Sequence, residues 1–131
     1  MAELTVRLVA TDRIVFRGPA SLVVLETVDG RVGIMPRHSP MMGILQDAPL
    51  LIRTEEGDQY AAVHGGFVTV DQDNVIILAE IAEMSHEISA EEAKKTVAAL
   101  GQAQDDVSKA RLKKAEVRLD VVARTQSTRM H

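Results

Sequence analysis

The stretch FVTVDQDNVIILAEIAEMSHEISAEEAKKTVAALG, residues 67–101, changes its periodicity part-way along, and this change decides the fold. Up to about residue 82 it is rich in Val and Ile around a turn signal at residues 71–74, which is typical of a β-hairpin. Further on, Ser89 is a good N-cap residue, and Glu92 completes the sequence of a capping box. The sequence therefore predicts a β domain followed by a helical one, with the boundary near residue 85.

The part before this boundary has the features of an all-β domain. Aliphatic runs such as LTVRLVA and SLVVLET alternate with turn signals about every ten residues, and the runs are rich in Val, Leu and Ile. No segment of helical length separates them, which argues against a parallel βαβ fold. We therefore expect an α+β chain, mostly β, with residues 1–84 forming a β-sandwich.

The part after the boundary, residues 85–131, reads as a helical hairpin. We expect helices at about 89–100 and 105–124, joined by residues 101–104, and a disordered tail from about 125. An apolar stripe marks the second helix, at Leu112, Ala115, Leu119 and Val122. Because alanine dominates both helices, the hairpin would be marginal by itself. We expect it to lean on the β domain or on a partner, and to be able to release.

Composition excludes several classes of protein. The 131 residues include no Cys, which excludes a disulfide framework, a thiolate zinc site and a cysteine nucleophile. No apolar run approaches the ~20 residues that span a bilayer, and the alternating start MAELTVRLVA lacks the apolar core of a signal peptide. We therefore expect a cytosolic protein, which is still compatible with a place on a membrane complex.

Charge is unevenly distributed along the chain. The net charge of -4 argues against a general nucleic-acid binder. Residues 101–131 nevertheless hold seven basic and four acidic side chains, so this tail is basic and the rest of the chain strongly acidic. Such asymmetry indicates that the tail faces a different partner from the body.

Catalytic motifs are missing from the sequence. The four histidines form no pair at metal-ligand spacing, and neither a phosphate-binding glycine loop nor a GxSxG elbow occurs. The sequence therefore predicts no catalytic residue, no metal site and no cofactor. A small enzyme that uses His38 is an alternative, but no helper group accompanies this histidine.

The stretch GRVGIMPRHSPMMGIL, residues 30–45, is the most distinctive part of the chain. A hairpin turn is expected at residues 29–30, and Pro36 and Pro40 should stiffen the backbone between them. His38 either holds its own loop by hydrogen bonds or contacts a partner. Met41 and Met42 are either ordinary core or adaptable contact residues. A rigid, exposed loop without catalytic groups favours recognition.

Three motifs resemble those of a known family. DGRVGIMPRHSPMMGIL, VHGGFVTVDQDNVIILAEIAE and EISAEEAKK occur here in the order and spacing of the epsilon subunit of the F-type ATP synthase. The first motif carries the pattern of a glycine, then GI, a proline and H-x-P. The second carries GGF followed by a hairpin and LAE. The resemblance covers nearly the whole chain, including the change from strands to helices.

The resemblance implies a ten-stranded β-sandwich followed by two antiparallel helices. It also implies a non-catalytic rotor subunit of the central stalk, which couples rotation of the membrane c-ring to the catalytic head. Family members bind the gamma subunit and rest on the c-ring, at the cytoplasmic side of the cell membrane. Their hairpin either folds down on the sandwich or extends toward the alpha and beta subunits, where it blocks ATP hydrolysis in many members.

Carried onto this chain, the resemblance assigns two sets of contact residues. Residues 30–40 would lie at the sandwich end facing the c-ring, with the segment after them near gamma. The c-ring and gamma set is Gly30, Arg31, Pro36, Arg37, His38, Ser39, Pro40, Met41 and Met42. The inhibitory set, facing a beta subunit, is Lys109, Arg111, Lys113, Lys114 and Arg118. A solvated helix face remains the alternative interpretation of these five bases.

Three positions, in two motifs, depart from the family pattern. Many relatives carry an acid where this chain has Arg31, which reverses the charge offered to the c-ring. Some relatives bind ATP through a motif that begins Ile/Leu-Asp-x-x-Arg-Ala, whereas this chain has Ser89 and Glu92 in place of the Asp and the Arg. A nucleotide-sensing module, in which ATP holds the hairpin down, is therefore an alternative that these substitutions disfavour, because Glu92 would repel phosphates.

Overall fold

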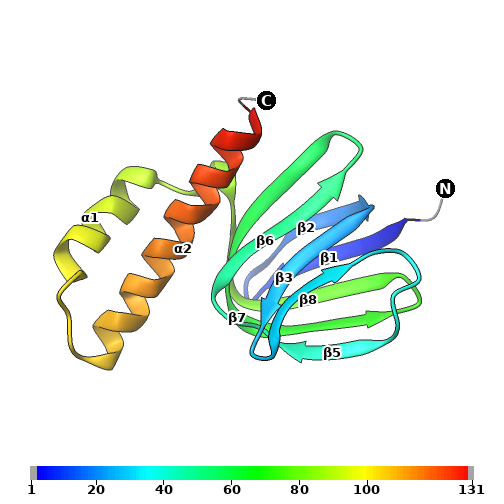
Figure 1. Ribbon diagram of the computed structural model, residues 1–131, viewed down its shortest axis with the longest axis horizontal. Coiled ribbons are helices and arrows are strands. Elements are labelled where there is room, and N and C mark those ends of the chain that lie inside the picture. The colour runs from blue at the N-terminus through cyan, green and yellow to red at the C-terminus, as the bar shows by residue number, and fades with distance from the viewer. Residues whose placement is uncertain (1–2, 130–131) are drawn as a thin grey trace.

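The computed structural model describes residues 3–129 and shows a β-sandwich with a helical hairpin packed against one side (Figure 1). The eight strands form one hydrogen-bonded sheet. They are β1 (Leu4–Ala10), β2 (Arg13–Ala20), β3 (Leu22–Thr27), β4 (Gly30–Ile34), β5 (Met41–Ile44), β6 (Ala48–Thr54), β7 (Gly57–Asp71) and β8 (Asn74–Met84).

Two long strands fold this one sheet into two layers. The hydrogen-bonded order is β2-β1-β8-β7-β6-β3-β4, and β5 pairs with β7. The first half of β7 pairs with β6, from Thr54↔Gly57 to Ala48↔Val63, while its second half pairs with β5. The parallel β1–β8 pairing uses only the first half of β8. Each long strand therefore contributes to both layers.

The expected number of ten strands is wrong, for a reason that lies in β7 and β8. These strands have 15 and 11 residues, and each continues unbroken from one layer into the other. The sandwich thus contains eight strands, of which two, β7 and β8, belong to both layers. The hairpin expected at residues 71–74 joins them, and its pairing ends at Asp71↔Asn74.

The bend between the layers lies at Gly65 and Gly66. Both have positive φ, +68° and +108°, which L side chains rarely adopt. A Cβ on Gly66 would lie 1.9 Å from the carbonyl oxygen of Leu78 on β8, so a side chain there has no room. Glycine at this corner therefore lets the two longest strands stay paired while they turn.

The core lies between the layers and is aliphatic, as expected. Alternate residues of each strand point inward, so that Leu4, Val6 and Leu8 of β1 are fully buried while their neighbours face outward. They pack with Ile52 of β6 and Ile77 of β8 in a single cluster. Burial of this apolar surface is the main force that holds the layers together.

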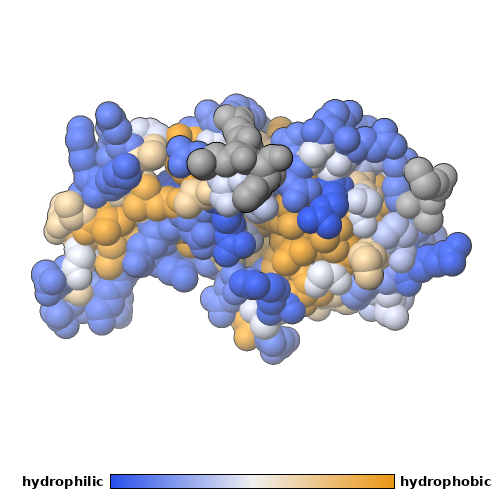
Figure 2. Space-filling view, turned by 45° about the horizontal axis from the view of Figure 1, so that its top comes forward, coloured by the Kyte–Doolittle hydropathy of each residue, from blue (hydrophilic) through white to orange (hydrophobic). Residues whose placement is uncertain are grey.

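The helical part begins with a 3-10 turn, Ser85–Glu87, and continues as α1 (Ala90–Leu100) and α2 (Asp106–Arg129). Ser89 caps α1 as expected, because its hydroxyl accepts a hydrogen bond from the Glu92 N–H at 3.2 Å. The end of the second helix at 124 was wrong, since α2 continues through Arg129; residues 130–131 of the expected disordered tail lie outside the described residues. Figure 2 shows hydrophobic residues gathered along the hairpin between hydrophilic edges.

Replacing Gly66 by alanine should destabilise the sandwich by more than about 2 kcal/mol, because the new Cβ would collide with backbone and φ would be strained. Chemical denaturation measures the change. Gly33→Ala is the matched control, since its nearest neighbour is the Leu22 side chain at 4.0 Å. Equal stability of the two variants would contradict the role of the corner.

Candidate functional site

The distinctive stretch 30–45 is not one loop. Gly30 and Arg31 begin β4, and residues 36–40 form the connection that follows its other end. The contact residues expected from the sequence are therefore divided between two ends of a strand. A hairpin turn is present, but its two turn residues are Val28 and Asp29, one position earlier than expected, and Gly30, with a φ of +127°, already pairs with Thr27.

The connection of residues 36–40 is held by polar contacts. The Arg37 N–H donates to the Asp73 carboxylate at 2.7 Å, which ties this segment to the β7–β8 turn. Arg37 has a φ of +69°. His38 has its Nδ1 2.7 Å from the Ser39 carbonyl oxygen, so the histidine holds its own loop, the first of the two roles that its sequence allows. Ser39 and Pro40 are exposed.

An exposed apolar row crosses the layer that contains β5. Ile44, Phe67 and Leu78 lie side by side on β5, β7 and β8, because Ile44 pairs with Phe67 and Phe67 with Leu78. The chain has only two phenylalanines, and one of these two large apolar side chains, Phe67, is 52% exposed instead of buried in the core. We call these three residues the apolar row. Simple alternation along β7 does not predict this row, since the bend at Gly65 and Gly66 changes which alternate residues face outward: Ala61 and Val63 are core residues before it, and Val68 and Val70 after it.

Met42 extends this surface and Met41 does not. Met42 lies two residues before Ile44 on the same face of β5 and is 81% exposed. Met41 is partly buried and packs against the core. Met41 is therefore an ordinary core residue, and Met42 is a candidate contact residue.

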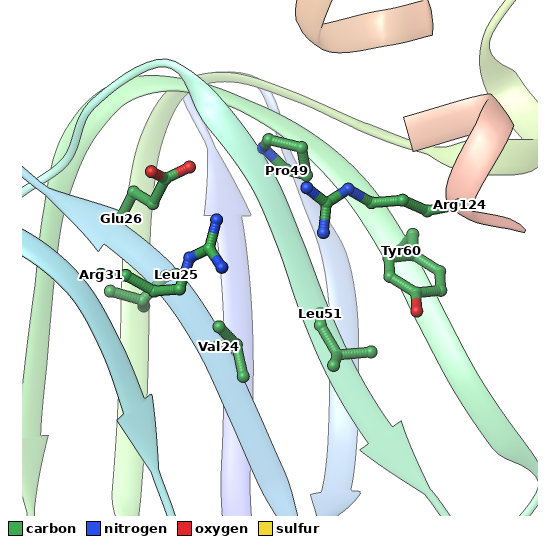
Figure 3. Close-up of a pocket in the computed structure, with 8 residues that line it drawn as sticks. All are labelled: Val24, Leu25, Glu26, Arg31, Pro49, Leu51, Tyr60 and Arg124. Carbon is green, nitrogen blue, oxygen red and sulfur yellow. The ribbon is translucent and has the colours of Figure 1, made fainter. Parts of the chain in front are cut away.

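Arg31 faces a pocket rather than the loop of residues 36–40. It lies opposite Glu26 on β3 and, with Arg124 of α2, lines a pocket of about 70 Å³. Figure 3 shows the Arg124 side chain reaching from the helix toward β6 above Tyr60, with Glu26 and Arg31 across the pocket. The arginine that departs from the family pattern thus faces the end of α2.

The opposite layer carries the hairpin. Val117 and Val121 of α2 are buried against Ala62 of β7, with Tyr60 and Ile88 packed around them. Ala62 and His64 alternate with core residues along β7, so they point outward and are buried by the helix. The β7–β8 sequence therefore supplies two outer surfaces, one covered by α2 and one bearing the apolar row.

Two ion pairs frame the contact between α2 and the sandwich. Lys114 Nζ lies 3.5 Å from Asp47 Oδ2, and Arg118 Nε donates to Glu83 Oε1 at 2.6 Å. Lys114, Val117, Arg118 and Val121 share one helix face by their spacing. We call these two ion pairs together with His64 the docking cluster. Lys114 and Arg118 therefore contact the sandwich here, while Lys109, Arg111 and Lys113 are exposed.

His64 lies at the centre of this cluster and is 1% exposed. Its Nδ1 is 3.7 Å from Asp47 Oδ2 and its Nε2 is 3.9 Å from Glu83 Oε1, and neither nitrogen has a hydrogen-bond partner. Burial lowers the pKa of His64, since the charged form would lose its hydration. The carboxylates of Asp47 and Glu83 oppose this shift, and the cations Arg118 and Lys114 add to it.

In residues 3–129 no group of three or more His, Asp or Glu side chains is placed to hold a metal ion. The Ser89 hydroxyl, at the start of the segment that resembles a nucleotide motif, is used as a helix cap. An exposed apolar row on a small β-sandwich is typical of assembly subunits, a class of protein that binds other chains.

Comparison with known proteins gives this class a family. Residues 3–85 match the β-sandwich domain of the ATP synthase delta/epsilon chain. The chain is 48% identical to the ATP synthase epsilon chain of Streptomyces griseus, over 93% of this chain and 97% of that one. It is 42% identical to the epsilon chain of Rhodococcus jostii, over 90% and 96% of the two chains.

Two solved structures share the fold. A chain of the Euglena gracilis mitochondrial ATP synthase superposes with a TM-score of 0.72 at 20% identity, over 100% of this chain and 83% of that one. A chain of the Tetrahymena thermophila mitochondrial ATP synthase, from its central stalk and c-ring, gives 0.60 at 19% identity over 93% and 95%.

The chain belongs to the ATP synthase epsilon family, which confirms the resemblance seen in the sequence. It is therefore a non-catalytic central-stalk subunit and part of a membrane-associated complex. No helix within residues 3–129 has both the length and the apolar character that crossing a bilayer requires.

Replacing Arg118 by alanine should loosen α2 from the sandwich. The pair with Glu83 is partly exposed, so we expect a cost of up to about 1 kcal/mol, or a roughly two- to fivefold rise in helix opening. Hydrogen exchange of the α2 amides measures this rise. Arg111→Ala, on an exposed position of the same helix, should leave exchange unchanged; an equal effect of both variants would contradict the assignment.

Proposed function

We propose that this chain transmits torque in the rotor of an ATP synthase, with its sandwich held between the gamma subunit and the c-ring. The observation that carries the proposal is the apolar row, which leaves large side chains exposed on an otherwise well-packed sandwich. A contiguous exposed apolar surface marks a protein interface. Membership in the epsilon family supports a rotor position for it.

Gamma is the partner that fits the apolar row. A rotor subunit must stay attached through every rotation, and permanent interfaces are the more hydrophobic ones. Met42 continues the row along β5, and residues 36–40 lead directly into that strand. We assign Pro36, Arg37, His38, Ser39, Pro40 and Met42, together with the apolar row, to the gamma contact.

The turn that begins β4 fits the c-ring better. Gly30 and Arg31 are exposed and lie at the other end of β4 from residues 36–40. An exposed arginine suits a polar contact that is broad and weakly specific. The charge of Arg31 calls for a complementary acid on the ring loops. The complex would lie at the cytoplasmic side of the cell membrane, as the resemblance implies.

The hairpin is proposed to inhibit ATP hydrolysis when it leaves the sandwich. Its bases would then face acidic surfaces of the alpha and beta subunits. Lys114 and Arg118 pair with sandwich carboxylates in the docked form, so they become available only on release. Lys109, Arg111 and Lys113 are exposed already. Lys114 and Arg118 can therefore bind either the sandwich or the catalytic head, but not both at once, as expected of a two-state element.

Phe67→Asp should weaken binding to gamma at least tenfold, because it places a charge in the middle of the apolar row. Titration calorimetry with purified gamma measures the dissociation constant. Ile14→Asp is the matched control, an exposed isoleucine on β2 outside the row. If both variants bind gamma like the parent chain, the row is not the gamma contact.

Stopping the chain after Glu87 should raise ATP hydrolysis by the assembled enzyme several-fold, because the hairpin is lost. This end keeps the ion pair of Arg13 with Glu87 at 2.8 Å and the Glu87 cap on the Met84 N–H. Hydrolysis is compared with that of the full-length assembly, after gel filtration confirms that the truncated chain is incorporated. Unchanged hydrolysis with intact assembly would show that the hairpin is no brake.

A further inference from the structure

His64 is buried in the docked form although neither proposed partner surface uses it. It lies on β7 beneath α2, between Asp47, just before β6, and Glu83 on β8. Both ring nitrogens are buried without a hydrogen bond. A buried polar atom without a partner is costly, and each such atom in a native structure calls for an explanation.

The docked form fits a neutral imidazole. Two carboxylates, Asp47 and Glu83, face two cations, Lys114 and Arg118, so the four charges cancel when His64 is neutral. These four are the charged groups that act on the ring from β8, from the segment before β6 and from α2. A proton on His64 would leave one uncompensated positive charge in a buried site, and it would draw the carboxylates away from the helix.

The released form fits a protonated imidazole. Without α2 the ring regains water, and the two cations depart with the helix. Asp47 and Glu83 remain on either side of the ring, 3.7 and 3.9 Å from its two nitrogens in the docked geometry. Two carboxylates flanking one imidazolium stabilise its charge. The charged neighbours of His64 thus favour the neutral ring in the docked form, where the cations are present, and the protonated ring in the released form, where only the carboxylates remain.

We propose that His64 is a proton-operated latch, which holds α2 on the sandwich while the imidazole is neutral and releases the helix when the ring takes up a proton. The docking cluster is the whole device: Lys114 and Arg118 on the helix compete with the imidazolium for Asp47 and Glu83.

The direction of the pH dependence follows from linkage. The pKa of His64 is lowered in the docked form, by burial first and by the neighbouring cations. The released form therefore binds more protons, and docking is strongest above the released-form pKa, which Asp47 and Glu83 hold above the ordinary value of about 6.5. Docking weakens as the pH falls below the released-form pKa, by up to about tenfold per pH unit until the docked-form pKa is reached.

Energy transfer between two dyes on the full-length chain tests the latch. The chain has no Cys, so Glu55→Cys on the β6–β7 turn and Gln102→Cys between the helices give unique labels at exposed positions. We expect transfer to change between pH 8 and pH 5 as α2 leaves. With His64→Gln added, transfer should be constant over this range. His38→Gln is the matched control and should follow the parent.

Two results would overturn the proposal: constant transfer in the parent chain, or the same pH response in His64→Gln as in the parent. If His64→Gln fails to fold, the double variant Lys114→Gln/Arg118→Gln tests the latch instead. It alters partly exposed helix residues and favours release, so the NMR titration of its His64 ring should show a higher pKa than in the parent. An equal or lower pKa refutes the latch.

The effect on hydrolysis rests on the inhibitory role proposed for the hairpin, whereas the latch does not. If the truncated chain leaves hydrolysis unchanged while transfer still responds to pH through His64, the inhibitory role fails and the latch stands. If truncation relieves inhibition and His64→Gln responds to pH like the parent, the latch fails and the inhibitory role stands.

Discussion

The corner at Gly65 and Gly66 is the constraint on which the rest of the structure depends. It allows β7 and β8 to remain paired while they pass from one layer to the other, so a single sheet closes over an aliphatic core. The same corner changes the outward direction of β7 from His64 on one layer to Phe67 on the other. One backbone bend therefore positions both outer surfaces, the one that α2 covers and the one that bears the apolar row.

The contact between α2 and the sandwich combines a small apolar area with a dense set of charges. Val117 and Val121 bury little surface, and α1 packs mainly on α2. Such a contact is easily opened, since partly exposed ion pairs contribute only about 0–1 kcal/mol each. The buried and unpaired imidazole of His64 lowers this stability further. A marginal contact of this kind is what a releasable hairpin requires.

Much of the fold could be read from the chain. The change of period near Ser85 and the cap at Ser89 are local signals, and each lies where the sequence predicted it. The turn between β3 and β4 is a local signal too, and it lies one residue before the predicted position. The strand count and the end of α2 could not be read, because pairing continues through the corner and the helix extends beyond its apolar stripe. Of the contact residues, His38 and Met42 lie on an outer surface, but Arg31 and residues 36–40 proved to be separated by β4.

The sequence by itself determined the class of fold, the absence of catalytic motifs and the family, since period, caps and motif spacing are written along the chain. Only the tertiary structure decided the docking cluster and the apolar row. Asp47, His64, Glu83 and Arg118 are far apart in sequence, and they meet because β6, β7 and β8 are neighbours in the sheet and α2 packs on β6 and β7. Ile44, Phe67 and Leu78 form a row because three strands pair in one register. Contacts between residues that are far apart in sequence cannot be read from the chain, because strand register and helix packing determine them.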